Sequence, residues 1–195
     1  MEELVIASDN KGKINEFKKL IQGISLLSLK DIGYAKEIPE PFDSFNENAF
    51  AKAQAIYEAF GRNVFADDSG ICVSALNGEP GVASAHYSGE RNDTKNTDLL
   101  LANLAGQEDR GAFYIAVICL IWEGRTFFFE GVCNGTITKE RKGTMGFGYD
   151  PIFMPDGYDQ TFAELPLEIK NKISHRGIAV GNMVQFLHEE IGKTQ

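Results

Sequence analysis

The sequence predicts an α/β protein built on a mixed β-sheet. The apolar run Val64-Phe65-Ala66 is typical of a short buried strand, and it follows a segment of helical periodicity. A second run, Phe113 to Trp122, is apolar at successive positions, as expected of a central strand that is buried on both faces. Glu123-Gly124 then indicates a tight turn before another strand. We therefore expect a hairpin within the sheet, and antiparallel as well as parallel pairing.

The first expected elements are a strand and a helix joined by a lysine-containing loop. Leu4 to Ala7 is apolar, and apolar residues recur at helical spacing from Ile14 to Ile21. The loop between them places two lysines and a glycine at the start of the helix. Positive charge is unfavourable there because the helix macrodipole is already positive at that end, and a bound anion would reverse the penalty. The loop is a candidate phosphate site, with a solvated lysine pair as the alternative, and it lacks Walker A spacing.

A second helix is predicted from Ser44 to Phe60. Ser44-Phe45-Asn46-Glu47 matches a capping box, and Gly61 is a plausible stop. The remaining sequence signals are weaker, and Leu26 to Ile38 shows no clear pattern. They indicate a turn at Asn77-Gly78, a short helix at Leu99 to Leu104, a strand at Thr126 to Cys133 and a closing helix from Ile178 to Ile191.

Three polar stretches interrupt this pattern and are candidate functional sites. Asp67-Asp68 follows the Val64 strand, and alternation along an extended chain should point the two carboxylates to opposite sides. A turn after the strand is the alternative. Gly143 to Pro151 interleaves glycines with aromatic residues, which allows close backbone approach and offers flat faces for a base; a loop plugging the core is the alternative. Glu168 to Gly177 gathers donor-rich side chains, which could also be surface ion-pair partners.

The composition is that of an ordinary globular chain. Hydrophobic residues make up 43% of the 195 residues and the formal net charge is -9, which argues against general binding to nucleic acid or anionic membranes. Cys72, Cys119 and Cys133 lie in apolar surroundings, which favours free thiols in a reducing compartment. Without a visible signal segment, an apolar run of ~20 residues, a repeat or a linker, we expect one cytoplasmic domain over residues 1–195 that does not enter a membrane.

Six short motifs, taken together, resemble the inosine/xanthosine triphosphate pyrophosphatase family, also called XTP/dITP diphosphatases. They are N-x-x-K at Asn10–Lys13, E-N-A at Glu47–Ala49, A-D-D-S-G at Ala66–Gly70, P-G-V-x-S-A at Pro80–Ala85, G-F-G-Y-D-P at Gly146–Pro151 and S-H-R-G at Ser174–Gly177. Each motif is weak alone, but the ordered set spans nearly the whole chain and is specific. The resemblance implies an elongated mixed β-sheet flanked by helices, with two lobes around a deep substrate cleft, and a homodimer that uses Mg²⁺.

The resemblance also implies the site residues. Asp68 would bind the metal and act as the general base, and Glu40 would be the second metal ligand. The implied substrate-binding residues are Ser8, Asp9, Asn10, Lys11, Gly12 and Lys13 in a triphosphate loop, Phe147, Gly148, Tyr149 and Asp150 in a nucleoside pocket, and Ser69, Lys170, His175 and Arg176 as further contacts. Three residues depart from the family pattern: Asp9 replaces a small residue, Phe42 replaces Gly, and His86 replaces Arg.

The implied reaction is hydrolysis of ITP, dITP or XTP to the monophosphate and pyrophosphate, which removes these nucleotides from the pool used for DNA and RNA. Water would attack the α-phosphorus, with Lys11 or Lys13 and Mg²⁺ neutralising phosphate charge. Asp67 is the second candidate for the base. Donors on His175 and Arg176 would favour purines with a C6 carbonyl over adenine. The alternatives are a non-catalytic nucleotide-binding module and a related pyrophosphatase for other modified nucleotides.

Overall fold

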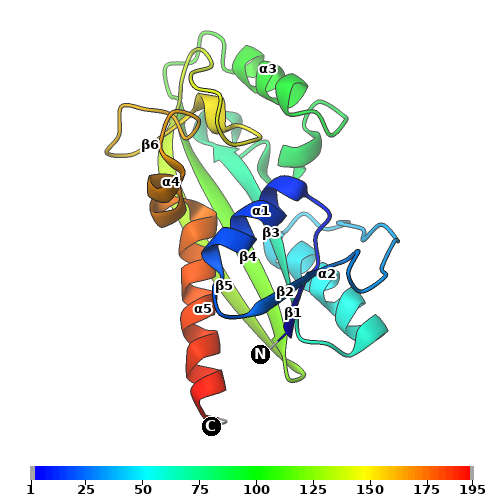
Figure 1. Cartoon of the computed structure of the whole chain (residues 1–195). Coiled ribbons are helices and arrows are strands. Elements are labelled where there is room, and N and C mark those ends of the chain that lie inside the picture. Colours follow the sequence, from blue (N-terminus) through cyan, green and yellow to red (C-terminus); the bar gives the residue numbers. More distant parts are fainter. Residues whose placement is uncertain (1–2, 194–195) are drawn as a thin grey trace. The chain divides into compact units, whose positions relative to one another are not determined.

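The fold is a six-stranded mixed sheet with flanking helices (Figure 1). The computed structural model describes residues 3–193, and the strand order is β2-β1-β3-β4-β5-β6. The strands are β1 Glu3–Ile6, β2 Ser25–Ser28, β3 Val64–Val73, β4 Gly111–Trp122, β5 Arg125–Ile137 and β6 Phe153–Pro155. β1 pairs in parallel with β2 and β3, whereas β5 and β6 are antiparallel. The prediction of an α/β fold with a mixed sheet flanked by helices is therefore confirmed.

The helices are α1 Lys11–Leu20, α2 Phe45–Phe60, α3 Asp93–Asn103, α4 Leu167–Ile173 and α5 His175–Lys193. Side chains cap the first turns of α1, α2 and α3. For α2, the Ser44 side chain accepts a hydrogen bond from the Glu47 N–H at 3.4 Å, and Gly61 closes the helix with φ of 60°. The predicted boundaries of this helix are confirmed.

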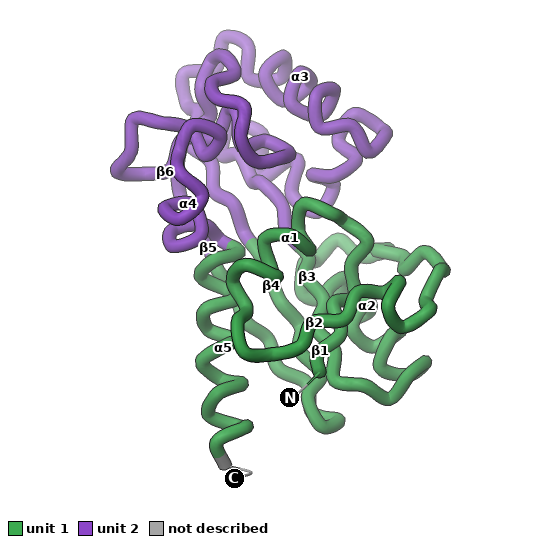
Figure 2. Tube along the Cα trace, viewed as in Figure 1, with its two compact units in different colours: residues 1–68, 116–131, 176–195 green, residues 69–115, 132–175 purple. Residues whose placement is uncertain are grey.

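The described chain divides into two compact units (Figure 2). Within residues 3–193, unit 1 holds residues 3–68, 116–131 and 176–193, and unit 2 holds residues 69–115 and 132–175. The chain passes from one unit to the other within β3, β4 and β5, and again at the start of α5. Each unit has a hydrophobic core of its own.

The unit 1 core forms where α1 and α5 pack against one face of the sheet. Phe17 of α1 and Met183 of α5 lie in one buried cluster with Ile6 of β1 and Phe65 of β3. The strand residues that alternate with these, such as Val64, are equally buried. Because side chains alternate along a strand, these residues face the other side, where α2 supplies its buried apolar stripe. Successive residues of β3 in unit 1 therefore face different helices.

The unit 2 core gathers the other half of the long strands around aromatic residues. Tyr114 of β4 lies within 4.8 Å of Phe153 and 6.0 Å of Phe162, measured between ring centroids. Leu100 and Leu104, at the end of α3, are completely buried in the same cluster. This aromatic packing supports the loops that precede β6 and α4.

Three elements differ from the sequence expectations. β3 was expected to end before Asp67, but it continues to Val73 because Gly70 allows close approach of another segment. A Cβ atom at Gly70 would lie 2.2 Å from the Gly81 carbonyl oxygen, so a side chain there would prevent this approach. The approaching segment also carries Ser84, whose hydroxyl accepts the Ile71 N–H at 2.9 Å. The interpretation of Asp67-Asp68 as a turn after the strand was therefore wrong.

The other two differences are the start of α3 and the presence of β2. α3 begins at Asp93 instead of Leu99 because the Asn92 side chain caps it, accepting the Lys95 N–H at 3.0 Å. β2 lies in the stretch that showed no pattern, and its four residues are all half-buried. Among the helices of residues 3–193, none is long and apolar enough to cross a membrane.

Candidate functional site

Asp67 and Asp68 lie within β3 of unit 1, and both carboxylates are buried. Asp67 is 1% exposed and Asp68 is 5% exposed. As neighbours on a strand, the two side chains point to opposite faces of the sheet, as predicted. They therefore have different partners. Asp67 contacts α1 and α5, whereas Asp68 contacts α2.

Asp67 joins two cations that come from different helices. The Lys13 Nζ atom lies 3.0 Å from Asp67 Oδ2, and the Arg176 Nε atom lies 3.4 Å from Asp67 Oδ1. Arg176 also donates to Glu16 Oε2 at 2.6 Å. Two carboxylates and two cations therefore form one buried chain of ion pairs across α1, β3 and α5.

Asp68 has a different set of partners on α2. The Asn48 amide nitrogen donates to Asp68 Oδ2 at 3.2 Å, and the Lys52 Nζ atom lies 3.5 Å from Asp68 Oδ1. Lys52 also donates to the Asp67 carbonyl oxygen at 2.7 Å and forms an ion pair with Glu40. Asn48 and Lys52 are one helical turn apart, which places both side chains on the face of α2 that β3 covers.

The two environments move the acidity of the two carboxyl groups in opposite directions. Burial alone would raise the pKa of Asp67, but Lys13 and Arg176 beside it hold that pKa well below its usual range. Burial raises the pKa of Asp68, and the cations Lys52 and Lys13 offset this only in part. Asp67 is thus a permanently charged partner for cations, whereas Asp68 is the carboxylate better able to take up a proton.

The loop Ser8–Lys13 forms the N-terminus of α1, as the sequence predicted. Asn10 is the N-cap residue, and its side chain accepts the Lys13 N–H at 3.1 Å. Ser8 accepts the Asn10 N–H at 3.2 Å, and the first turn of the helix contains no acidic residue. Asp9 and Lys11 are exposed, and Gly12 is half-buried. The Lys13 side chain is only 15% exposed, and its ion pair with Asp67 holds it in place.

The acidic loop before α2 is tied to the same helix through Asn48. Glu40 pairs with Lys52, and the backbone of Phe42 is bracketed by the Asn48 side chain, which accepts its N–H at 3.0 Å and donates to its carbonyl at 2.9 Å. These bonds use only main-chain atoms of Phe42, whose side chain is 42% exposed. Both hydrogen bonds to Asn48 are therefore compatible with a side chain at this position.

The glycine-aromatic loop of unit 2 is held by polar contacts beneath it. Asp150 accepts the Phe147 N–H at 2.9 Å and the Lys170 ammonium at 2.6 Å on the same oxygen. A Cβ atom at Gly146 would lie 2.0 Å from that oxygen, so only glycine fits there. The Tyr149 hydroxyl donates to the Ser84 carbonyl at 2.8 Å. Phe147 and Gly148 are half-buried, whereas Tyr149 and Asp150 are buried.

Lys170 and His175 are also buried in unit 2. The Lys170 Nζ atom lies 5.3 Å from the centroid of the Phe147 ring and 5.6 Å from that of Phe162. His175 stacks on Tyr114, with ring centroids 4.5 Å apart and planes within 4°. Ser69, the first residue of unit 2, lies on β3 next to Asp68 and is half-buried.

Sequence reasoning missed three polar residues of unit 1 that the structure brings together. Asn48 was part of a quoted motif but received no role, and Lys52 and Glu16 were not singled out. All three are less than 9% exposed. A lysine one turn after an asparagine, on the apolar face of a predicted helix, is the signal that could have indicated Asn48 and Lys52.

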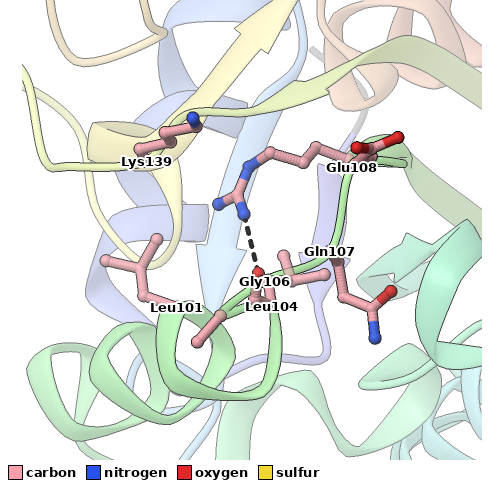
Figure 3. A pocket seen from close by; sticks show the side chains of 8 residues that line it. Leu101, Leu104, Gly106, Gln107, Glu108 and Lys139 are labelled. Atoms are coloured by element: carbon pink, nitrogen blue, oxygen red, sulfur yellow. Dashed lines mark hydrogen bonds between the residues drawn. The ribbon is translucent and has the colours of Figure 1, made fainter.

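One surface pocket of the described chain lies apart from the expected site residues. A surface pocket of about 620 Å³ lies at the end of α3, lined by Leu101, Leu104, Gln107, Glu108, Arg110 and Lys139 among others (Figure 3). Arg110 donates to the carbonyls of Leu104, Ile137 and Thr138, and none of the expected site residues lines this pocket. Within residues 3–193 no three His, Cys, Asp or Glu side chains form a metal cluster.

Comparison with known proteins identifies the family. The model of the Ham1 family matches residues 4–186. The chain belongs to the Ham1 family. A dITP/XTP pyrophosphatase of Flavobacterium johnsoniae is 48% identical over 187 residues, which cover 95% of this chain and 97% of the relative. A dITP/XTP pyrophosphatase of Halalkalibacterium halodurans is 44% identical over 193 residues, covering 96% and 100%.

Solved structures of Ham1 proteins have the same fold. The Staphylococcus aureus Ham1 protein superposes with a TM-score of 0.88 at 40% identity, covering 97% of this chain and 100% of that one. A HAM1 protein from Coxiella burnetii gives a TM-score of 0.89 at 36% identity, with coverage of 97% and 100%. The family resemblance inferred from the six motifs is therefore confirmed.

Proposed function

We propose that this Ham1 protein hydrolyses dITP, XTP and ITP to the nucleoside monophosphate and pyrophosphate. Relatives named dITP/XTP pyrophosphatase align with it over nearly the full length of both chains. The observation that carries the proposal is the pair of adjacent carboxylates in opposite environments, Asp67 held charged by two cations and Asp68 with a raised pKa. Phosphoryl transfer requires positioning and charge neutralisation more than covalent chemistry, and this site offers both.

Asp68 is the proposed general base. Its carboxylate accepts a hydrogen bond from the neutral Asn48 amide and lies 3.5 Å from the Lys52 ammonium, so it is more available than Asp67 to accept a proton from a water molecule. Asp67 is less suited to this role because its carboxylate is engaged by Lys13 and Arg176. Asp67 would instead hold Lys13 ready to contact phosphate oxygens at the N-terminus of α1, where Ser8 to Lys13 would receive the triphosphate.

We propose Mg²⁺ as the cofactor, bound by Asp68 and Glu40. Both carboxylates converge on the Lys52 ammonium, so they are close enough to share one cation. A pair of carboxylates fits Mg²⁺, which takes one or two from a protein and completes its shell with water and substrate phosphate. When bound, the metal would neutralise phosphate charge and lower the pKa of its water.

Unit 2 is proposed to bind the nucleoside. The half-buried Phe147 ring offers a face for stacking against a base, and Asp150 and Lys170 support it from below. His175 and Arg176 remain the proposed source of preference for a C6 carbonyl. Arg176 is 3% exposed and already donates to Asp67 and Glu16, so any contact with the base must use its remaining donors.

We further propose that the protein is a cytoplasmic homodimer that binds no nucleic acid. The three buried free cysteines suit a reducing compartment, and the net charge of -9 disfavours nucleic acid. β6 pairs with Gly135–Ile137 of β5. In the described part of the chain, no strand pairs with the outer edge of β5 from Arg125 to Gly131. Phe128 on this strand is 46% exposed, and such an edge favours pairing with a second copy. Light scattering should give a dimer, and Phe128→Lys should shift it toward the monomer.

The experiment that tests the proposed reaction is pyrophosphate release from dITP, XTP, ITP, GTP and ATP, each with and without Mg²⁺. Metal-dependent release from the first three, with GTP and ATP nearly inert, is expected. Equal release from all five would keep the reaction but discard the account of base selection. No release from any would leave a nucleotide-binding module, and release only from other modified nucleotides would indicate a related pyrophosphatase.

A further inference from the structure

Two consecutive backbone N–H groups in the glycine-aromatic loop are bound by carboxylates from different elements. The Phe147 N–H donates to Asp150 Oδ2 at 2.9 Å, within the loop. The Gly148 N–H donates to Asp93 Oδ2 at 2.7 Å, and Asp93 lies 55 residues earlier in the chain. Consecutive amides of this kind could otherwise bind an anion. Because protein carboxylates occupy them, the loop is suited to presenting the Phe147 ring and not to binding phosphate.

Asp93 is well placed to act as a fixed anchor for this loop. It is the first residue of α3, and the preceding Asn92 caps the helix through the Lys95 N–H. The helix is fastened to unit 2 by Asn96, which is 1% exposed and bonds to the Ala85 carbonyl at 3.0 Å and the Ser88 N–H at 2.8 Å. Asp93 itself is exposed, so its carboxylate is not needed to fill the core.

The loop needs such an anchor because its backbone is intrinsically free. Gly146 and Gly148 have φ of 79° and 63°, in the left-handed region that glycine samples readily. The two carboxylates fix the chain on either side of the Phe147 α-carbon, and Thr97 of α3 reaches the Gly148 carbonyl at 3.5 Å. Removal of the Asp93 carboxylate would release the Gly148 N–H and loosen the backbone that carries the Phe147 ring.

We propose that Asp93 is a positioning residue for nucleoside binding, acting through the Gly148 amide to set the Phe147 ring. This inference rests on the proposed function, because it assigns the loop to the nucleoside part of the substrate. The residue does not touch the reacting atoms in this account. Its loss should weaken binding of the nucleoside and leave binding of the phosphate groups intact.

The test compares Asp93→Ala and Asp93→Asn with the full-length wild type, using calorimetric titration of inosine monophosphate and, separately, pyrophosphate. Asp109→Ala is the matched control, because Asp109 also binds a glycine amide in unit 2, that of Gly111 at 2.9 Å, outside the proposed site. Asp93→Asn keeps an oxygen that can accept the Gly148 N–H but removes the charge that favours a helix N-terminus. It therefore separates loop anchoring from helix stability.

We expect Asp93→Ala to weaken inosine monophosphate binding about tenfold, because the loosened loop would have to be ordered when the nucleoside binds, while pyrophosphate binding stays within about twofold. Asp93→Asn should recover most of the loss, and Asp109→Ala should bind both ligands as the wild type does. Unchanged monophosphate affinity in Asp93→Ala, or an equal loss for pyrophosphate, would overturn the inference. So would a wild type that binds no monophosphate. If the wild type binds the monophosphate but hydrolyses nothing, the proposed reaction fails and the Asp93 comparison still stands.

Discussion

The carboxylates of unit 1 and the glycine-aromatic loop of unit 2 are both candidate functional features, yet they are held in different ways. Asp67 and Asp68 sit on a strand and meet side-chain charges from three helices. Phe147 and Gly148 lie in a loop whose own amides are bound by Asp150 and Asp93. The first arrangement determines the charge of the two carboxylates, and the second determines the conformation of the loop. Changes in unit 1 should therefore alter rate and stability, and changes in unit 2 should alter substrate affinity.

The largest effect is expected from Asp68→Asn. We expect kcat for XTP to fall at least ~100-fold, which is the contribution typical of a general base. The fold should remain, because burial already disfavours the charged form of Asp68 and asparagine is neutral. Steady-state kinetics and thermal unfolding measure the two quantities. Asp109→Asn serves as the matched control, and near-normal turnover in Asp68→Asn would remove Asp68 from the mechanism.

Asp67→Asn should act mainly on stability. The substitution leaves Lys13 and Arg176 buried beside a neutral group, and breaking one side of a buried ion pair costs about 3 kcal/mol or more. Denaturant unfolding measures this loss. The matched control is Asp98→Asn, which breaks an exposed ion pair with Arg141 and should cost no more than ~1 kcal/mol. Equal losses for the two variants would mean that the buried chain of ion pairs does not hold unit 1 together.

Gly146→Ala should raise KM for XTP about tenfold, with a smaller change in kcat. The added Cβ atom would lie 2.0 Å from Asp150 Oδ2, so the Asp150 carboxylate and the loop above it must move. The control is Gly157→Ala, which has the same left-handed backbone, with φ of 82°, but no atom within 4 Å of the added Cβ. It carries only the backbone strain, of about 1 kcal/mol. Indistinguishable kinetics for the two variants would contradict the proposed role of the loop.

The smallest effect is expected in the reactivity of the cysteines, whose labelling rates report on the packing of each unit separately. Burial raises the pKa of Cys119 to about 12 and that of Cys133 to about 11, so little thiolate is present at pH 8. A thiol reagent should label the native protein far more slowly than the unfolded chain. Cys72 and Cys133 of unit 2, at 8% and 7% exposed, should react before the completely buried Cys119 of unit 1. Rapid labelling of Cys119 would mean that unit 1 opens more readily than its packing suggests.

The sequence predicted those parts of the fold that local chemistry determines. The capping box at Ser44 and the positive-φ turn at Glu123-Gly124 both lie where their residues indicated. β3 was predicted too short, because its continuation depends on the approach of Gly81 and Ser84 to Gly70, which no local pattern records. α3 was predicted to begin too late, because its first turns are polar and are buried only through the contacts of Asn96 and Thr97.

The candidate site was predictable to a similar degree. The motifs singled out Asp68, Lys13 and the Phe147 loop as candidates, because these residues stand beside glycines and turns that are visible in the sequence. They did not locate Lys52 or Glu16, whose importance lies in pairing with residues on other elements. The family resemblance ranked Asp68 above Asp67 as the base, but the sequence did not predict that the two carboxylates have different partners. That difference arises from which helices cover each face of β3, and helix placement is a property of the folded chain.

The most direct test of the central claim is hydrolysis of XTP in water enriched in oxygen-18, with both products analysed by mass spectrometry. If water activated at Asp68 attacks the α-phosphorus, the label should enter the nucleoside monophosphate and be absent from pyrophosphate. Asp68→Asn should give the same labelling pattern at a far lower rate. Label in pyrophosphate, or formation of the diphosphate and inorganic phosphate, would contradict the account.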